Sequence, residues 1–145
     1  SLKYKYATSV GEELTEHTIA LLKTMVLPPI QFLTPIPIYW YKENTRGFNQ
    51  SAELGRKVAE SLRIEFIPDL LIKKTSTASQ AGLDKKERLQ NLRGSFAFNS
   101  DYVLSAVYSV LIFDDVFTTG STMFEATKVL KRAGIRKVWG LAIAR

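Results

Sequence analysis

The chain has no cysteine and only one histidine among its 145 residues. The absence of cysteine excludes disulfides, thiolate metal sites and a cysteine nucleophile, and it fits a reducing compartment. The one histidine, His17, lies in a segment with helical periodicity, where a surface or packing role is expected rather than catalysis. Any chemistry in this chain must therefore be built from other side chains.

Long apolar runs and internal repeats are also lacking. The longest apolar stretch, IALLKTMVLPPIQFL, is interrupted by Lys23 and a proline pair, so no membrane insertion is expected. The N-terminus has no signal-peptide layout, which favours a cytoplasmic protein. Hydrophobic residues make up 46% of the chain, as in ordinary globular proteins. The length fits a single domain, residues 1–145.

Acidic residues are in the minority, with 14 against 20 lysines and arginines, which gives a formal net charge of +6. Many of the basic residues fall between Glu125 and the C-terminus. This surplus suits anionic partners, either phosphorylated metabolites or nucleic acid. The alternative is a solvated surface with cations at the C-terminal end of a helix, and charge alone favours that alternative.

Strand and helix patterns alternate along the chain, which predicts an α/β fold with an open, mostly parallel sheet. Gly134 is expected to end the last helix in a left-handed conformation, and Asp84 to cap a short helix. Helices are expected at about 10–25, 50–62, 84–92 and 121–133. Strands are expected within 31–40, 66–74, 96–98, 102–113 and 136–144.

Some of these elements carry specific expectations about burial. The prolines Pro35 and Pro37 indicate an edge strand, or a strand that ends in a shaped loop. In the last strand, Trp139 is expected in the core. The first helix is expected to turn four residues toward the core, namely Leu14, Ile19, Leu21 and Leu22.

The most informative stretch is VLIFDDVFTTGST, from Val110 to Thr122. Four consecutive apolar residues are typical of a central strand covered on both faces. The hydroxyl-rich turn after them contains Gly120 and leads into a helix, whose first amides lack internal partners and carry the positive end of the dipole. Amides and hydroxyls together form a phosphate cradle. The patterns GxxxxGK[ST] and GxGxxG are absent, so the turn is neither a nucleotide P-loop nor a dinucleotide fingerprint.

Two adjacent carboxylates, Asp114 and Asp115, stand between this strand and the turn. Neighbouring strand residues point to opposite faces, so a close acid/base pair is not expected. A carboxylate at a strand end suits the vicinal diol of a ribose, and it can hold magnesium directly or through water. Beside a phosphate cradle, the pair predicts a site for ribose 5-phosphate. The alternative is a plain strand–turn–helix with acids at the edge of the sheet.

These residues resemble a known family. VLIFDDVFTTGST is similar to the phosphoribosyl-pyrophosphate motif of type I phosphoribosyltransferases. PIPIYWYKENTRGFNQSAELGRKVA, KKTSTASQAGLDKKERLQNLRGSFAF and this motif follow one another as in the ComF family of competence-associated phosphoribosyltransferase-like proteins. The resemblance extends from about Phe32 to Ala144. It implies the type I phosphoribosyltransferase fold, a Rossmann-like three-layer arrangement with a flexible hood loop at about 73–95.

The resemblance also implies roles for individual residues. Asp114 and Asp115 would hold the ribose hydroxyls of phosphoribosyl pyrophosphate, and Mg²⁺ directly or through water. The loop that contains Lys42 and Arg46 would approach the pyrophosphate. The 5-phosphate would bind to Thr118, Thr119, Gly120, Ser121 and Thr122, and the hood would contribute Lys73, Lys74, Gln80 and Arg88.

The sequence departs from related families in two respects. ComF proteins commonly carry an N-terminal four-cysteine zinc module, which a chain without cysteine lacks, so no zinc is expected here. Purine-salvage transferases carry a catalytic carboxylate at the position of Thr118, and a threonine cannot serve as that base. The acceptor of the phosphoribosyl group is therefore unknown, and so is the catalytic residue.

Two functions remain open at this point. The first is a magnesium-dependent enzyme that transfers the phosphoribosyl group to an unknown acceptor and releases pyrophosphate, linked to DNA uptake. The second is a non-catalytic module that binds a nucleotide or single-stranded DNA and a competence-protein partner. The aromatic run Tyr39, Trp40 and Tyr41 suits base stacking, and equally suits packing of its loop against the sheet. A homodimer is compatible with either function.

Overall fold

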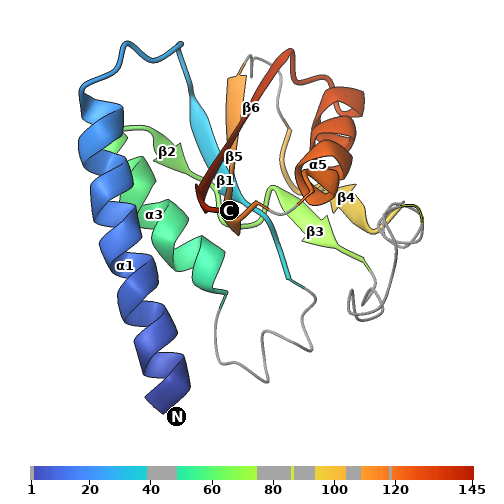
Figure 1. Cartoon of the computed structure of the whole chain (residues 1–145). Coiled ribbons are helices and arrows are strands. Elements are labelled where there is room, and N and C mark those ends of the chain that lie inside the picture. Colours follow the sequence, from blue (N-terminus) through green and yellow to red (C-terminus); the bar gives the residue numbers. More distant parts are fainter. Residues whose placement is uncertain (1, 39–48, 75–85, 87–93, 104–108, 118) are drawn as a thin grey trace.

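The computed structural model describes residues 2–38, 49–74, 86, 94–103, 109–117 and 119–145, with the backbone alone for residues 2–8 (Figure 1). Its main sheet has the strand order β2-β1-β5-β6, and every neighbouring pair is parallel. These strands are β1 (Phe32–Pro35), β2 (Glu65–Phe66), β5 (Ser109–Val116) and β6 (Lys137–Ala144). The predicted α/β class with a mostly parallel sheet is confirmed.

Two helices, α1 (Leu2–Lys23) and α3 (Gln50–Leu62), cover one face of the main sheet. α3 lies unusually close to the strands, because a Cβ atom on Gly55 would stand 3.2 Å from side-chain carbons of both Leu33 and Phe113. The core on this face consists of Leu33, Leu54, Val58, Ala59, Leu111 and Phe113.

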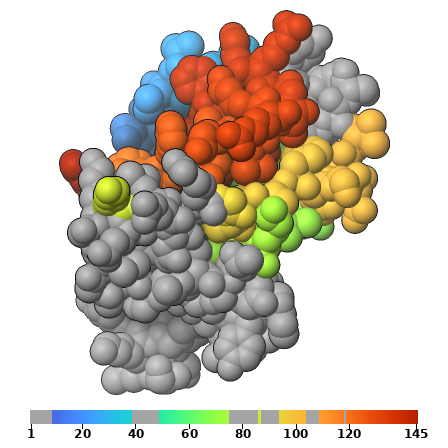
Figure 2. Space-filling view, turned by 90° about the vertical axis from the view of Figure 1, so that its right-hand side faces the viewer, coloured from blue at the N-terminus to red at the C-terminus, as the bar shows by residue number. Residues whose placement is uncertain are grey.

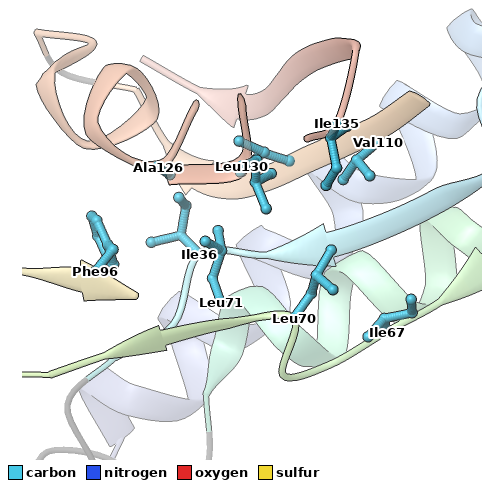
Figure 3. Packing of buried hydrophobic residues seen from close by; sticks show 10 residues of the cluster. Ile36, Ile67, Leu70, Leu71, Phe96, Val110, Ala126, Leu130 and Ile135 are labelled. Carbon is cyan, nitrogen blue, oxygen red and sulfur yellow. The ribbon is translucent and has the colours of Figure 1, made fainter. Parts of the chain in front are cut away.

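The other face is covered by α5 (Ser121–Arg132) together with a small antiparallel sheet of β3 (Leu71–Lys73) and β4 (Phe96–Phe98). Figure 3 shows the apolar side chains that fill the space between these layers. Val110 and Ile112 of β5 point to this face, whereas Leu111 and Phe113 point to α3. Since both faces are covered, the strand VLIF is central, as predicted.

The first helix differs from its prediction. It begins at Leu2 and not near residue 10, and it packs on α3 through a narrow face. Buried Gly11 allows this contact, because a Cβ there would lie 2.8 Å from Gln50 Nε2. Ile19 and Leu22 pack against the core as expected, but Leu14 and Leu21 are 37% and 62% exposed.

Two expectations about strands are corrected as well, and one open alternative is decided. β1 lies between β2 and β5 and ends at Pro35, so of the two alternatives the strand end holds and the edge strand does not. The segment 66–74 divides between the two sheets, as β2 and β3. Trp139 is 42% exposed, because β6 is the last strand in the order of the described sheet.

Other expectations, on a helix end and on surface residues, agree with the structure. Gly134 follows α5 with φ of +106°, the left-handed conformation predicted for it. His17 is exposed, as expected for a surface residue. The helix predicted at 84–92, with its cap Asp84, falls almost wholly outside the described residues. Of the helices in the described part of the chain, none combines the length and apolar character needed to cross a bilayer.

Candidate functional site at the carboxyl end of β5

Asp114 and Asp115 occupy the carboxyl end of β5, one strand position after the buried core residues. The amide of Ile36 donates to the carbonyl of Phe113 at 2.8 Å, so the end of β1 is fastened beside them. Both carboxylates are partly buried. Parallel sheets bind ligands at this edge, so the fold places the pair where a ligand site is expected.

A residue from another element, Ser51 in the first turn of α3, joins the two carboxylates. Its Oγ lies 3.1 Å from Asp115 Oδ1 and 3.3 Å from Asp114 Oδ1. The backbone N–H of Asp115 also donates to Ser51 Oγ at 3.3 Å and to Asp114 Oδ1 at 2.9 Å. The expectation that strand alternation keeps these acids apart is therefore incomplete. Ser51, which is 63 residues from Asp114 in the sequence, contacts both carboxylates.

The electrostatics of the pair follow from this arrangement. Burial raises the pKa of the Asp114 carboxyl to about 7, and a side-chain hydrogen bond and the charge of Asp115 add to the rise. The N–H of Asp115 and the hydroxyl of Ser51 oppose it without cancelling it. Two carboxylates held this close favour either a shared proton or a ligand that supplies positive charge or hydroxyl donors.

The turn after β5 has the backbone of an anion site. Gly120 is the N-cap of α5 with φ of +82° and has no side chain to cap the helix, while the amide of Ser121, the first residue of α5, donates to Thr119 Oγ1 at 3.4 Å. Thr119 Oγ1 and Ser121 Oγ lie 2.6 Å apart at its start. The ring of Phe117 packs over the glycine, since an added Cβ would stand 2.9 Å from Phe117 Cζ. The positive φ therefore favours glycine here, and any larger residue would also have to displace the Phe117 ring.

A small hollow brings part of the predicted set together. Asp114, Gly120 and Thr122 line it, with Val116, Phe117 and Met123. Phe117 also lines an open hollow of about 370 Å³, together with the end of β6 from Ala142 to Arg145. Asp115 and the Thr119–Ser121 hydroxyl pair stand outside the lining of the small hollow. One carboxylate and the turn that starts α5 thus open onto a common space.

Hydrogen bonds hold residues next to the predicted pyrophosphate loop and the predicted hood. Asn49 accepts from the amide of Ala52 as the cap of α3, and its Nδ2 donates to the carbonyl of Ile36 at 3.2 Å. On the α5 side, buried Glu125 accepts from the amide of Gly94 at 3.2 Å. These contacts hold the residues that flank the predicted pyrophosphate loop and the predicted hood.

Several predicted site residues fall outside the described part of the chain, namely Thr118, Lys42, Arg46, Gln80 and Arg88. Of the predicted hood residues, Lys73 places its Nζ 5.8 Å from the centre of the Phe96 ring. Lys74 is exposed, and its amide donates to the carbonyl of Ser95 at 2.8 Å. The roles predicted for all of these residues remain predictions.

The donor chemistry at the strand end fits magnesium in part. Carboxylate oxygens are the ligands it prefers, and it usually keeps several waters and shares its remaining positions with substrate phosphates. Within the described residues, no group of three or more acidic or imidazole side chains converges. Asp114 and Asp115 would therefore hold such an ion together with a phosphorylated ligand that brings further oxygen atoms.

Comparison with solved structures defines the class of fold. A glutamine phosphoribosylpyrophosphate amidotransferase from B. subtilis matches with a TM-score of 0.54 and 18% identity, over 94% of this chain and 25% of that one. A hypoxanthine phosphoribosyltransferase from Staphylococcus aureus matches with a TM-score of 0.50 and 14% identity, over 93% of this chain and 62% of that one. The chain has the phosphoribosyltransferase fold.

Sequence comparison identifies relatives of this chain within the phosphoribosyltransferase fold. Competence protein F of Haemophilus influenzae is 34% identical over 114 residues, which are 77% of this chain and 50% of that protein. DNA utilization protein YhgH of Escherichia coli is 31% identical over 75% of this chain and 48% of its own length. Competence protein ComFC of Streptococcus pneumoniae is 28% identical over 99% of this chain and 56% of its own.

The resemblance to the ComF family is thereby confirmed: the chain is a homologue of these competence and DNA-utilization proteins. It spans about half the length of the curated relatives it matches. No protein-family model matches the chain.

Proposed function

We propose that the chain binds phosphoribosyl pyrophosphate with Mg²⁺ and transfers its phosphoribosyl group to an acceptor, in a process linked to DNA uptake. One observation carries this proposal: Asp114, whose carboxylate contacts Ser51, and the glycine that starts α5 line the same hollow. The carboxylates suit a ribose diol and the turn suits its 5-phosphate. The names of the curated relatives supply the link to competence and DNA use.

The transfer has a defined chemistry. The bond between the anomeric carbon and the pyrophosphate oxygen breaks, pyrophosphate leaves with the bonding electrons, and an acceptor nucleophile forms the new bond. Magnesium, when bound, neutralises part of the charge on the leaving group. The chain's own contribution is to hold the sugar by its diol and its phosphate, so that the anomeric carbon is presented in a fixed orientation. The open hollow beside Phe117 offers space for an acceptor.

Calorimetry with phosphoribosyl pyrophosphate, with and without Mg²⁺, tests the binding step. The native chain should bind the complete pair, and Asp115→Asn should weaken binding roughly tenfold to hundredfold, because a charged hydrogen-bond acceptor is lost. Exposed Asp101→Asn is the matched control and should bind normally. No binding by the native chain, or equal binding by Asp115→Asn, would sink the proposal. Pyrophosphate release against a panel of bases, amines and nucleotides then identifies the acceptor.

A second candidate is a non-catalytic module for single-stranded DNA. Phe124 on α5 is 61% exposed, and Lys128 Nζ lies 5.3 Å from the centre of its ring. Figure 2 shows α5 on the surface beside the segment that contains β4. An exposed ring beside a cation suits base stacking and backbone contact. Further along the chain, at the end of α5 and the start of β6, the exposed basic residues are Lys131, Arg132, Arg136 and Lys137.

A salt series in a gel-shift assay with single-stranded DNA tests this candidate. Binding should weaken steeply as salt rises, and Phe124→Ala should weaken it further at constant salt. Exposed Val26→Ala is the matched control on another part of the surface and should leave binding unchanged. If the protein binds phosphoribosyl pyrophosphate but no DNA at moderate salt, the second candidate is eliminated.

A further inference from the structure

We infer that Ser51 is a positioning residue, which orients Asp114 and Asp115 so that they can recognise the ribose diol. The inference rests on the proposed function, and it assigns a role to a side chain outside the strand–turn–helix motif. Ser51 belongs to α3 and not to the strand that carries the carboxylates.

The contacts of Ser51 single it out among the described serines. Its hydroxyl lies within 3.3 Å of an oxygen of each carboxylate and within 3.3 Å of the Asp115 amide. The side chain is only 6% exposed. A hydroxyl has one hydrogen, so it donates to one carboxylate at a time while its lone pairs accept from the amide. The one donor thus fixes the spacing between two acceptors that would otherwise repel each other.

The helix that carries Ser51 is anchored so that the hydroxyl has little freedom to move. One turn later, Gly55 lets the α3 backbone come so close that a Cβ there would be 3.2 Å from Phe113 Cδ1. Before it, Asn49 caps the helix and donates to Ile36. The carboxylates also face the first turn of α3, whose dipole end is positive. The position of α3 against β5 therefore determines where the two carboxylates point.

A purely structural role of Ser51 would have a different consequence for ligand binding. If Ser51 only satisfies buried acceptors, its loss lowers stability but leaves the preference for a diol unchanged. If it orients the carboxylates, its loss reduces the advantage of a ligand that has both hydroxyls over one that lacks the 2-hydroxyl. The ratio of two affinities separates these cases, because both ligands experience the same loss of folded protein.

The experiment measures the affinities of ribose 5-phosphate and 2-deoxyribose 5-phosphate, with Mg²⁺, for the whole chain. The native protein should prefer the ribose compound, and Ser51→Ala should reduce that preference at least threefold. Ser109→Ala is the matched control, because Ser109 is 3% exposed and bonds the Gln31 amide at the opposite end of β5. It should keep the native preference. Ser51→Cys, which replaces the hydroxyl with a somewhat larger and weakly donating thiol, should behave as Ser51→Ala does and serves if the alanine variant does not fold.

The possible outcomes distinguish a failure of the proposed function from a failure of the role inferred for Ser51. If the native chain binds neither phosphoribosyl pyrophosphate nor ribose 5-phosphate, the proposed function fails. If the native chain prefers ribose and the Ser51 variants keep the full preference, the function stands and the role of Ser51 is overturned. If Ser109→Ala reduces the preference as much as Ser51→Ala does, the effect is general loss of packing, and the inference is again overturned.

Discussion

A buried serine hydroxyl makes hydrogen bonds at each end of β5, but its partners differ between the two ends. At the amino end, buried Ser109 accepts from the Gln31 amide at 3.1 Å, and its own amide donates to Gln31 Oε1 at 3.4 Å. These partners are neutral. At the carboxyl end, the buried hydroxyl of Ser51 meets two carboxylates, and the pKa of Asp114 is raised to about 7.

The two ends therefore differ in what their burial costs. Matched neutral hydrogen bonds cost little to bury, whereas two close carboxylates in a partly buried place are expensive. Such a cost persists only where the surroundings impose it. The cost at the carboxyl end supports the ligand site proposed there, and it should appear in experiments that leave the amino end unaffected.

The largest effect is expected from the apolar middle of the strand. Phe113 is fully buried against Leu33 and Gly55, so Phe113→Ala should lower the free energy of unfolding by about 3–5 kcal/mol. Urea denaturation measures this directly. Phe117→Ala, at a ring that is 40% exposed, is the control and should cost much less. Equal losses would mean that the middle of β5 is not packed more tightly than the residue that follows its carboxyl end.

Gly120→Ala should have the next largest effect, roughly 2–3 kcal/mol, because it combines a left-handed φ of +82° with a contact of 2.9 Å to Phe117. Gly134→Ala is the matched control, with a φ of +106° and nothing within 4 Å of the added Cβ. It should cost only about 1 kcal/mol. Thermal unfolding of both variants compares the two, and a smaller loss for Gly120→Ala would contradict the packing described here.

The pH dependence of stability should report the carboxylate pair. The folded state keeps a proton on Asp114 up to about pH 7, while the unfolded chain releases it near 3.8. Between these values the folded state binds more protons, so stability falls as pH rises, by an amount on the order of 2 kcal/mol. Asp114→Asn should remove that component and be more stable than the native chain at pH 8. Parallel pH curves for the two proteins would contradict this account.

The smallest effect on stability is expected for Thr34 of β1, which pairs with Ile112 of β5 in the parallel register. Thr34 Oγ1 is buried and has no hydrogen-bond partner among the residues that the structure describes. Thr34→Val keeps the shape and removes the unsatisfied hydroxyl, so it should raise the free energy of unfolding by about 1 kcal/mol. Thr15→Val is the control, since the equally buried Thr15 hydroxyl donates to Gly11 at 2.8 Å. It should be neutral or destabilising in the same urea titration.

Much of the fold could be predicted from local patterns. Val110 to Phe113 form a central strand because no polar residue interrupts them, and Gly134 ends α5 because only glycine adopts that φ readily. Burial on the outer elements was harder to predict. Leu21 and Trp139 are apolar but exposed, because residue type does not indicate which face of α1 meets α3, or that β6 ends the described sheet.

The sequence by itself determined the order of the elements, the two adjacent acids at a strand end and the glycine that starts the next helix. These features depend on neighbours in the chain, where backbone geometry and polarity act directly. Only the tertiary structure decided that Ser51 lies between the two acids, and that Asp114 shares a hollow with Gly120 and Thr122. Such contacts depend on how closely α3 and α5 dock against β5, which is a property of packing and not of any local sequence pattern.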